Sequence, residues 1–245
     1  MTVLRAYIGT SGWNYAEWAH DFYADVAKKD WLRHYAQLFT AVEVNATFYR
    51  LQNRGTLERW KDKTPPDFRF AIKANRYLTH TKKLHDPEIP VQRERESAAG
   101  LGEKLAVVLW QLPAGLPKVM DRLAHLAKAL DTWEEVRHAL EFRHPSWFDQ
   151  EVADHLSAHR LAVCLSNAAD WPLWDTVTTN LVYVRLHGHT HTYASAYGAE
   201  LIDYWASRTQ GWLAEGRCVH VYFDNTAEGN APRDALRLRE RLKTP

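Results

Sequence analysis

Short apolar runs alternate with longer stretches of helical periodicity along this chain. The apolar runs, such as LAVVLWQ and LVYVRLH, are rich in β-branched and aromatic residues and have the length of ordinary strands. Regular alternation of strands and helices is typical of repeated βα units and a parallel sheet. The pattern predicts eight strands, at residues 6–9, 41–45, 68–73, 105–111, 138–143, 161–167, 181–187 and 219–225.

Seven of the intervening stretches carry an apolar stripe at helical spacing. They predict helices at residues 29–39, 56–63, 89–100, 118–130, 149–159, 199–215 and 231–242. Pro117 before one helix and Gly216 after another fit the usual preferences for helix ends. Residues 168–180 are the exception and predict a loop. Eight strand units are the number in a TIM (β/α)8-type barrel, so we expect a single α/β barrel domain over residues 1–245.

The composition is that of an ordinary globular protein, with 46% hydrophobic and 25% charged residues. The formal net charge of +1 argues against a nucleic-acid binder that relies on overall charge, although a local basic patch stays open. The aromatic content is high, with eleven Trp, eleven Tyr and eight Phe. Some of these side chains suit a cleft that stacks on sugars, bases or other flat ligands.

Only two cysteines occur, and both Cys164 and Cys218 lie in or beside apolar runs, so we expect buried free thiols. The amino-terminal stretch MTVLRAYIG has no secretory-signal pattern, and no apolar run approaches the length of a membrane span. We therefore expect a cytoplasmic protein without a membrane partner.

The predicted strands end in residues that are capable of chemistry or hydrogen bonding. In three of them the polar residues stand two positions apart, so both point to the same face of the strand. In a barrel the carboxyl ends of the strands converge on one mouth, where active sites lie. An internal network of structural ion pairs is the alternative explanation, because a charge buried alone is costly. The residues at these ends are Gly9, Thr10, Ser11, Glu43, Asn45, Lys73, Gln111, Glu141, Arg143, Asn167, Arg185, His187, Asp224 and Asn225.

At these same positions the chain resembles the YecE-like family, also called domain of unknown function 72. The resemblance covers nearly the whole chain. Its motifs are GTSGW at residues 9–13, VEVNATFYR at 42–50, Lys73, Thr79-His80, WQLP at 110–113, EFRHPSW at 141–147, YVRLHG at 183–188, Tyr193, Tyr197 and YFDN at 222–225.

The resemblance implies a TIM-barrel fold and no settled activity. A likeness of such proteins to endonuclease IV and sugar-isomerase barrels brings in phosphodiester or sugar ligands by analogy only. The chain departs from the family pattern at His20 and Ala24, which replace a usual Gly and Pro. It also has Asn167 where many members are expected to have Asp, which weakens an acid or metal role there.

Metal catalysis is one alternative, because HGHTH supplies His187, His189 and His191. Their spacing matches no established zinc motif, and we expect His189 and His191 on the loop surface. Several strand ends carry fixed cations, which repel a metal. We therefore assign no metal ligand, and no cofactor is identified.

Glycoside hydrolysis is a second alternative, because it needs two carboxyl groups flanking the scissile bond. Glu43 and Glu141 are the candidate pair. The large glycosidase barrel clan places its acids after strands four and seven, where this chain has Gln111 and His187.

The favoured hypothesis is an enzyme, such as a hydrolase or lyase, that binds a small anionic or phosphorylated compound. Arg143 and Arg185 are able to fork onto a phosphate or carboxylate, and Lys73 adds a point charge. The candidate catalytic residues, which move protons or orient the arginines, are Glu43, Glu141, His187 and His80. The candidate substrate-binding residues are Asn45, Tyr49, Lys73, Gln111, Arg143, Trp147, Arg185, Tyr222 and Asn225.

Nucleic-acid binding and a non-catalytic, ligand-binding barrel stay open as other classes. Basic loop residues beside Trp13, Tyr49 and Trp147 would form a groove that stacks bases. These are Arg50, Arg54, Arg76, Lys82, Lys83, Arg93 and Arg95. The chain has no GxGxxG, P-loop, GxSxG or CxxC motif. No motif therefore supports a nucleotide-fold dehydrogenase, a P-loop NTPase, a serine hydrolase or a thioredoxin-like protein.

Overall fold

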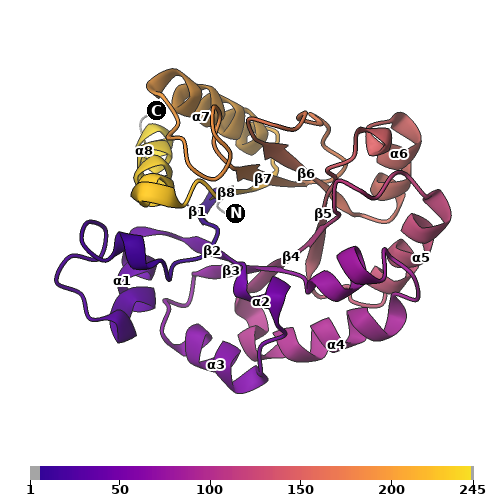
Figure 1. Cartoon of the computed structure of the whole chain (residues 1–245), viewed down its shortest axis with the longest axis horizontal. Helices are drawn as coiled ribbons and strands as arrows, with labels where there is room; N and C mark the ends of the chain where they lie inside the picture. Colours follow the sequence, from indigo (N-terminus) through magenta and orange to yellow (C-terminus); the bar gives the residue numbers. More distant parts are fainter. Residues whose placement is uncertain (1–5, 244–245) are drawn as a thin grey trace.

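Eight parallel strands form a nearly closed barrel, with the helices outside it (Figure 1). This computed structural model describes residues 6–243, so part of the amino-terminal stretch inspected for a signal lies outside the described residues. Each strand pairs with its neighbour in chain order, from β2 through to β8, and β8 pairs with β1. The strands are β1 (Ala6–Thr10), β2 (Ala41–Val44), β3 (Arg69–Lys73), β4 (Leu105–Gln111), β5 (Arg137–Glu141), β6 (Ala162–Asn167), β7 (Leu181–Leu186) and β8 (Cys218–Phe223). The predicted TIM-type barrel is confirmed.

The seam between β1 and β2 is closed by a side chain as well as by backbone. The Tyr35 hydroxyl accepts a hydrogen bond from the Thr10 amide at 2.8 Å and donates to the Ala41 carbonyl at 3.1 Å. Gly9 makes room for this hydroxyl, because a Cβ at that position would lie 2.0 Å from the Ala41 oxygen. The backbone also spans this seam, because the Gly12 amide donates to the Glu43 carbonyl at 2.7 Å.

The helices α1 and α3 to α8 cover the outside of the strands. They are α1 (Trp31–Leu38), α2 (Ala46–Tyr49), α3 (Arg54–Asp62), α4 (Glu88–Ala98), α5 (Met120–Leu130), α6 (Gln150–Ala158), α7 (Ala199–Ala214) and α8 (Asn230–Lys243). All seven predicted helices are present. The predicted loop at residues 168–180 is confirmed, since no helix lies between β6 and β7. The short α2 and a π-helical turn at Tyr77–Thr81 were not predicted, because segments this short show no periodicity.

Two helix starts are fixed by the side chain that precedes them. Asn53 accepts a hydrogen bond from the Thr56 amide at 2.8 Å, and Asp149 accepts one from the Val152 amide at 3.1 Å. Such caps satisfy amides that have no partner within the helix. Asp149 therefore precedes α6, although the helix was predicted to begin on it.

The barrel has an inner and an outer apolar layer. The outer layer, between strands and helices, holds large side chains such as Trp110 and Phe70. The inner layer is made largely of small residues at alternate strand positions, among them Ala41, Ala71 and Ala139. Because these residues fill little space, long polar side chains fit inside the barrel above them.

Several predicted strands extend one or two residues beyond the ladder. Asn45, Arg143, His187 and Asn225 follow the last paired residue of their strands. Their backbone leaves the sheet there, so their side chains belong to the loops of the mouth.

Two smaller expectations concern the thiols and the membrane. Cys164 is a buried free thiol as expected, whereas Cys218 is free but only partly buried, because it stands at the amino end of β8. Among residues 6–243, no helix is both long enough and apolar enough to cross a bilayer.

Candidate functional site

Arg185 lies at the centre of the carboxyl end of the barrel and is 0% exposed. Its Nε and Nη2 donate to the Glu43 carboxylate at 2.8 to 3.1 Å. Its Nη1 donates to Glu141 Oε2 at 2.8 Å, and Nη2 also donates to Asp224 Oδ2 at 3.0 Å. One guanidinium thus holds three carboxylates that come from β2, β5 and the end of β8. We call these four residues the acid network.

Glu43 is further held by two neutral donors. The Tyr183 hydroxyl donates to its Oε2 at 2.6 Å, and the Ser11 hydroxyl donates to its Oε1 at 2.5 Å. Both oxygens of this buried carboxylate therefore accept hydrogen bonds from side chains of the barrel. Such saturation is what a buried charge requires.

Glu141 joins the acid network to a second cation. The Arg143 Nε donates to Glu141 Oε1 at 2.5 Å, and the Ser166 hydroxyl reaches the same oxygen at 3.1 Å. The Arg143 guanidinium lies 3.6 Å from the ring centroid of Trp171. A planar cation stacked this closely on an aromatic face is held in one orientation.

His187 connects Arg185 with Asp224. Its Nε2 lies 3.2 Å from Arg185 Nη1 and 3.6 Å from Glu141 Oε1. Its Nδ1 is 2.9 Å from Asp224 Oδ2. The imidazole is fully buried and is oriented by these charged groups.

Two acids of the network, Glu141 and Asp224, are ionised at neutral pH. Burial alone would raise the pKa of Glu141, but Arg143, Arg185 and His187 together hold it well below its usual range. Burial likewise opposes ionisation of Asp224, and Arg185 with His187 outweighs it and lowers that pKa. These carboxylates are therefore poor proton donors at neutral pH.

Lys73, at the end of β3, differs from the other cations of the mouth. Its Nζ lies 4.2 Å from the ring centroid of Phe48, and among residues 6–243 no carboxylate oxygen lies within 4.0 Å of it. Burial, and then the positive charge of Arg185, lower the pKa of Lys73 to about 8. A fraction of this amine is therefore uncharged at neutral pH.

His80 faces the same aromatic ring. Its imidazole lies 5.0 Å from the Phe48 centroid, and its Nδ1 shares a hydrogen bond of 2.9 Å with the Thr79 hydroxyl. The π-helical turn at Tyr77–Thr81 carries both residues, and such turns often occur at functional sites. Burial, and then Lys73, Arg76 and Arg143, lower the pKa of His80 to about 4, so its ring is neutral.

Two predicted residues lie at the edge of the acid network. Asn45 donates weakly from Nδ2 to Asp224 Oδ1 at 3.5 Å, while its own oxygen is buried without a hydrogen-bond partner among the described residues. Gln111 is buried, and its amide donates to the Leu112 carbonyl at 2.8 Å. Both side chains thus lie where the sequence placed them, beside the strand ends.

Two aromatic candidates do not face the mouth. Trp147 is fully buried in the outer layer, where its indole donates to the Leu116 carbonyl at 2.8 Å. Tyr222 is buried inside the barrel, and its hydroxyl pairs with His220 at 2.9 Å. The expectation that they contact substrate does not fit these positions, because neither ring is accessible.

Tyr49 and Asn225 are also displaced from the acid network. Tyr49 is 72% exposed at the end of α2, so it stands out in solvent. Asn225 is fully buried and donates away from the mouth, to the Ser195 carbonyl at 3.0 Å and to Asp234 at 2.9 Å. Asn225 follows β8 by two residues, and its neighbour Asp224 takes the inward position instead.

Four contributing residues are not among the candidate catalytic or substrate-binding residues, although Ser11 and Asp224 are among the polar residues predicted at the strand ends: Ser11, Tyr183, Trp171 and Asp224. Strand periodicity contained the signal for two of them. Tyr183 precedes Arg185 by two positions, and Asp224 follows the inward Tyr222 by two. Trp171 lies in the irregular loop before β7, where no periodicity indicates the direction of a side chain.

The histidine and basic loop residues behave mostly as surface groups. His189 and His191 are exposed, as expected. Within residues 6–243 no group of three or more His, Cys, Asp or Glu is placed to hold a metal ion. Three of the seven basic loop residues pair with exposed acids, in the pairs Arg54–Glu58, Lys82–Asp86 and Arg95–Glu135.

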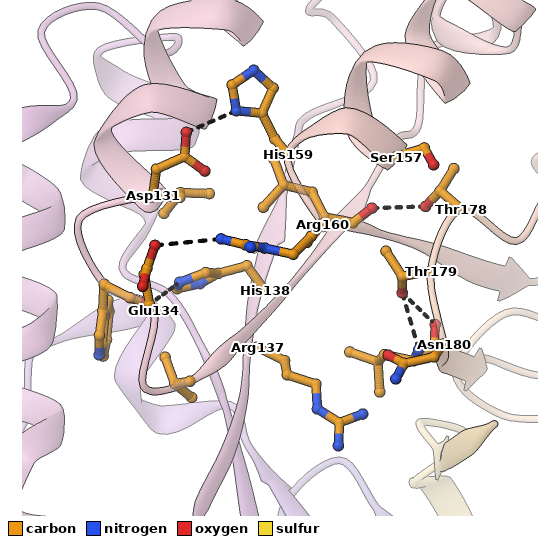
Figure 2. Close-up of a pocket in the computed structure, with 15 residues that line it drawn as sticks. Asp131, Glu134, Arg137, His138, Ser157, His159, Arg160, Thr178, Thr179 and Asn180 are labelled. Carbon is orange, nitrogen blue, oxygen red and sulfur yellow. Dashed lines mark hydrogen bonds and ion pairs between the residues drawn. The ribbon is translucent and has the colours of Figure 1, made fainter. Parts of the chain in front are cut away.

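A cavity of about 560 Å³ lies at the opposite pole, at the amino ends of β5, β6 and β7 (Figure 2). Two ion pairs lie among its polar side chains: Asp131 with His159 at 2.8 Å, and Glu134 with Arg160 at 3.3 Å. His138 at its wall is buried between the Trp110 indole and the Trp133 carbonyl. TIM-barrel enzymes work at the other end of the strands, so the size of this cavity does not make it the catalytic site.

Comparisons with known proteins agree with this architecture. The solved structure of a DUF72 family protein from Thermotoga maritima MSB8 has a TM-score of 0.86 and 25% identity, over 97% of this chain and 99% of that one. A DUF72 family protein from Enterococcus faecalis V583 has a TM-score of 0.84 at 21% identity, over 98% of this chain and 96% of that one, and supports the fold alone.

Among proteins compared by sequence, the UPF0759 protein YunF of Bacillus subtilis is 25% identical over 96% of this chain and 94% of its own length. The UPF0759 protein YecE of Escherichia coli K12 is 29% identical over 58% of this chain and 50% of its own length. The model of the family described as "Protein of unknown function DUF72" matches residues 7–245. The chain therefore belongs to the DUF72 family.

Proposed function

We propose that the mouth of the barrel is the active site of an enzyme that acts on a small compound bearing a carboxylate or phosphate. The observation that carries the proposal is the set of cations around the neutral ring of His80. Lys73 Nζ and the Arg76 guanidinium lie 4.2 and 5.9 Å from the ring centroid of Phe48, on which His80 also packs at 5.0 Å. After burial, these two cations and Arg143 lower the pKa of His80. Among residues 6–243 Lys73 forms no ion pair, and the nearby acids Glu43, Glu141 and Asp224 are bound by Arg185, so the charged form of Lys73 is available to a ligand.

Arg185 has a different role from the one its sequence position suggests. Its donors are taken by Glu43, Glu141 and Asp224, so it organises the acids. Through Glu141 it fixes Arg143, which Trp171 also supports. In this proposal Arg143, Arg76 and the charged form of Lys73 surround the anion, and the acid network preorganises Arg143.

The glycosidase and nuclease alternatives receive less support. A glycosidase needs one carboxyl group that stays protonated, whereas in the candidate pair the pKa of Glu141 is lowered and Glu43 is bound by Arg185, Tyr183 and Ser11. A nuclease of the endonuclease IV type needs acids and histidines grouped around metals. Here the acids are grouped around Arg185.

Calorimetric titration with inorganic phosphate and with pyruvate tests the proposal. We expect saturable binding that Lys73→Met and Arg143→Ala each weaken by at least about tenfold, because each removes a charge-assisted contact. Lys118→Met is the matched control, since Lys118 is bound to the exposed Asp149 and Glu151 and not to the acid network. Affinity that is the same in all four proteins would contradict the proposal.

A second readout follows the ring of His80 directly. A bound anion neutralises the surrounding cations, so the pKa of His80 should rise from about 4 toward its ordinary value of 6.5. Titration of the imidazole proton resonances with and without phosphate measures this change. A pKa that does not move under saturating phosphate would place the anion elsewhere.

A further inference from the structure

The surroundings of Lys73 suit an amine that acts as a nucleophile better than an amine that forms an ion pair. Its amine lies over Phe48 at 4.2 Å, and the nearby carboxylates of Glu43, Glu141 and Asp224 are already bound by Arg185. The surface lysines Lys82 and Lys118, in contrast, bind acids directly, and their pKa values are raised.

We propose that Lys73 forms an imine with an aldehyde or ketone that also carries a carboxylate or phosphate. This inference rests on the proposed function, because Arg143 and Arg76 bind the anionic group while Lys73 meets the carbonyl carbon. The side chain of Lys73 comes from the last residue of β3, so a rigid strand positions it at the mouth.

The covalent step balances without any outside reagent. The neutral amine of Lys73 attacks the carbonyl carbon, and the electron pair of the C=O bond moves to oxygen, which takes a proton to give a carbinolamine. The C–O bond then breaks. Both hydrogens of the amine leave with the oxygen as one water molecule, a C=N bond forms, and nothing is oxidised or reduced.

His80 is placed to carry the proton in this step. Its Nδ1 pairs with Thr79, and among the described residues its Nε2 has no hydrogen-bond partner. A neutral imidazole is able to accept a proton from the carbinolamine nitrogen and return it to the departing hydroxyl. The acid network contributes charge close to the iminium cation that forms when the imine is protonated.

The chemistry of the amine agrees with this geometry. Burial first, and then Arg185, lower the pKa of Lys73 to about 8, against an ordinary value of 10.5. Only the uncharged amine attacks a carbonyl. At neutral pH Lys73 therefore presents far more reactive amine than a solvated lysine does.

Reductive trapping tests the inference with two ketones, pyruvate and dihydroxyacetone phosphate. The whole protein is treated with each ketone and cyanoborohydride, and modified lysines are located by peptide mass spectrometry. We expect one adduct per chain, at Lys73, formed at least about tenfold faster than at Lys118. The trapping rate should rise through a pH of about 8, the pKa of Lys73.

Lys73→Arg separates this inference from the proposed function. Arginine keeps the positive charge and forms no imine, so the variant should bind phosphate and yet give no adduct. Wild-type protein that binds phosphate but is not trapped overturns the imine and leaves anion binding standing. Adducts spread evenly over surface lysines, or equal trapping in Lys73→Arg, overturn it as well. Absence of phosphate binding by the wild-type protein would instead overturn the proposed function.

Discussion

The guanidinium of Arg185 and the carboxylate of Glu43 form a fork in the interior of the barrel, with three contacts of 2.8 to 3.1 Å. Both side chains are fully buried. Glu43 lies two residues after Ala41 on the same face of β2, and the side chain of Arg185 reaches Glu43 from β7. The pair therefore ties opposite parts of the ring together and fixes the frame in which the mouth is built.

Replacing Arg185 by methionine should destabilise the protein strongly. The change leaves Glu43, Glu141 and Asp224 buried together without their shared cation, and removal of one partner from a buried ion pair costs about 3–5 kcal/mol. Urea unfolding followed by fluorescence measures the free energy of unfolding. Arg233→Ala, which breaks an exposed pair with Asp21, should cost at most about 1 kcal/mol. Equal decreases in the free energy of unfolding of the two variants would show that the acid network stabilises the fold no more than an exposed ion pair does.

Acid should weaken the fold through the same acids. The folded-state pKa of Glu141 lies below the ordinary 4.5, and that of Asp224 lies below 3.8. The stability that their ionised forms contribute is present above those ordinary values and is lost as the pH falls through the folded values. The free energy of unfolding should therefore decline below a pH of about 4.5.

Glu141→Gln is the matched variant for that acid response. It removes one of the titrating groups, so the difference in stability between wild type and variant should shrink as the pH falls. Parallel curves for the two proteins would contradict the assignment. The measurement is urea unfolding at a series of pH values.

Glu94 should respond to pH with the opposite sign. Its side chain is 2% exposed, its Oε2 accepts from the Asn75 amide, and its Oε1 has no hydrogen-bond partner among the described residues. Burial raises its pKa from 4.5 to about 7, so ionisation costs stability as the pH rises across that window. Glu94→Gln should therefore stabilise the protein above neutral pH by up to about 3 kcal/mol.

The control for Glu94 is its exposed neighbour on the same helix. Glu96→Gln should change stability by no more than about 0.5 kcal/mol at any pH. At acidic pH Glu94→Gln and the wild type should unfold with nearly the same free energy, because Glu94 is then protonated. A gain that is independent of pH would show that ionisation is not the cause.

Tyr35→Phe should weaken the seam of the barrel. The hydroxyl links the Thr10 amide to the Ala41 carbonyl, and its loss leaves both groups buried without that partner. An unsatisfied buried polar group costs about 1–3 kcal/mol, so thermal unfolding should shift downward accordingly. Tyr204→Phe is the comparison, since its ring is 46% exposed, and a change of at most about 0.5 kcal/mol is expected. Amide exchange at Thr10 that stays slow in Tyr35→Phe would contradict this role.

The order of the elements was predictable from the amino-acid sequence, because strand and helix periodicities are local properties. The sequence also placed Glu43, Glu141 and Arg185 at the ends of strands. The choice of face followed from alternation, so Tyr183 and Asp224 were also within its reach. The anion-binding role given to Arg185 came from its charge alone, and charge does not reveal which partners a side chain meets.

Those partners depend on how the strands close into a ring. Closure of the ring brings β2, β5, β7 and β8 around one axis, and contacts between residues more than a hundred positions apart leave no trace in local periodicity. Trp171 supports Arg143 from an irregular loop, and Trp147 turns into the outer layer although its motif looks like that of a site. Within the described part of the chain Lys73 forms no ion pair for the same reason, because Arg185, which reaches the axis from β7, binds the nearby carboxylates.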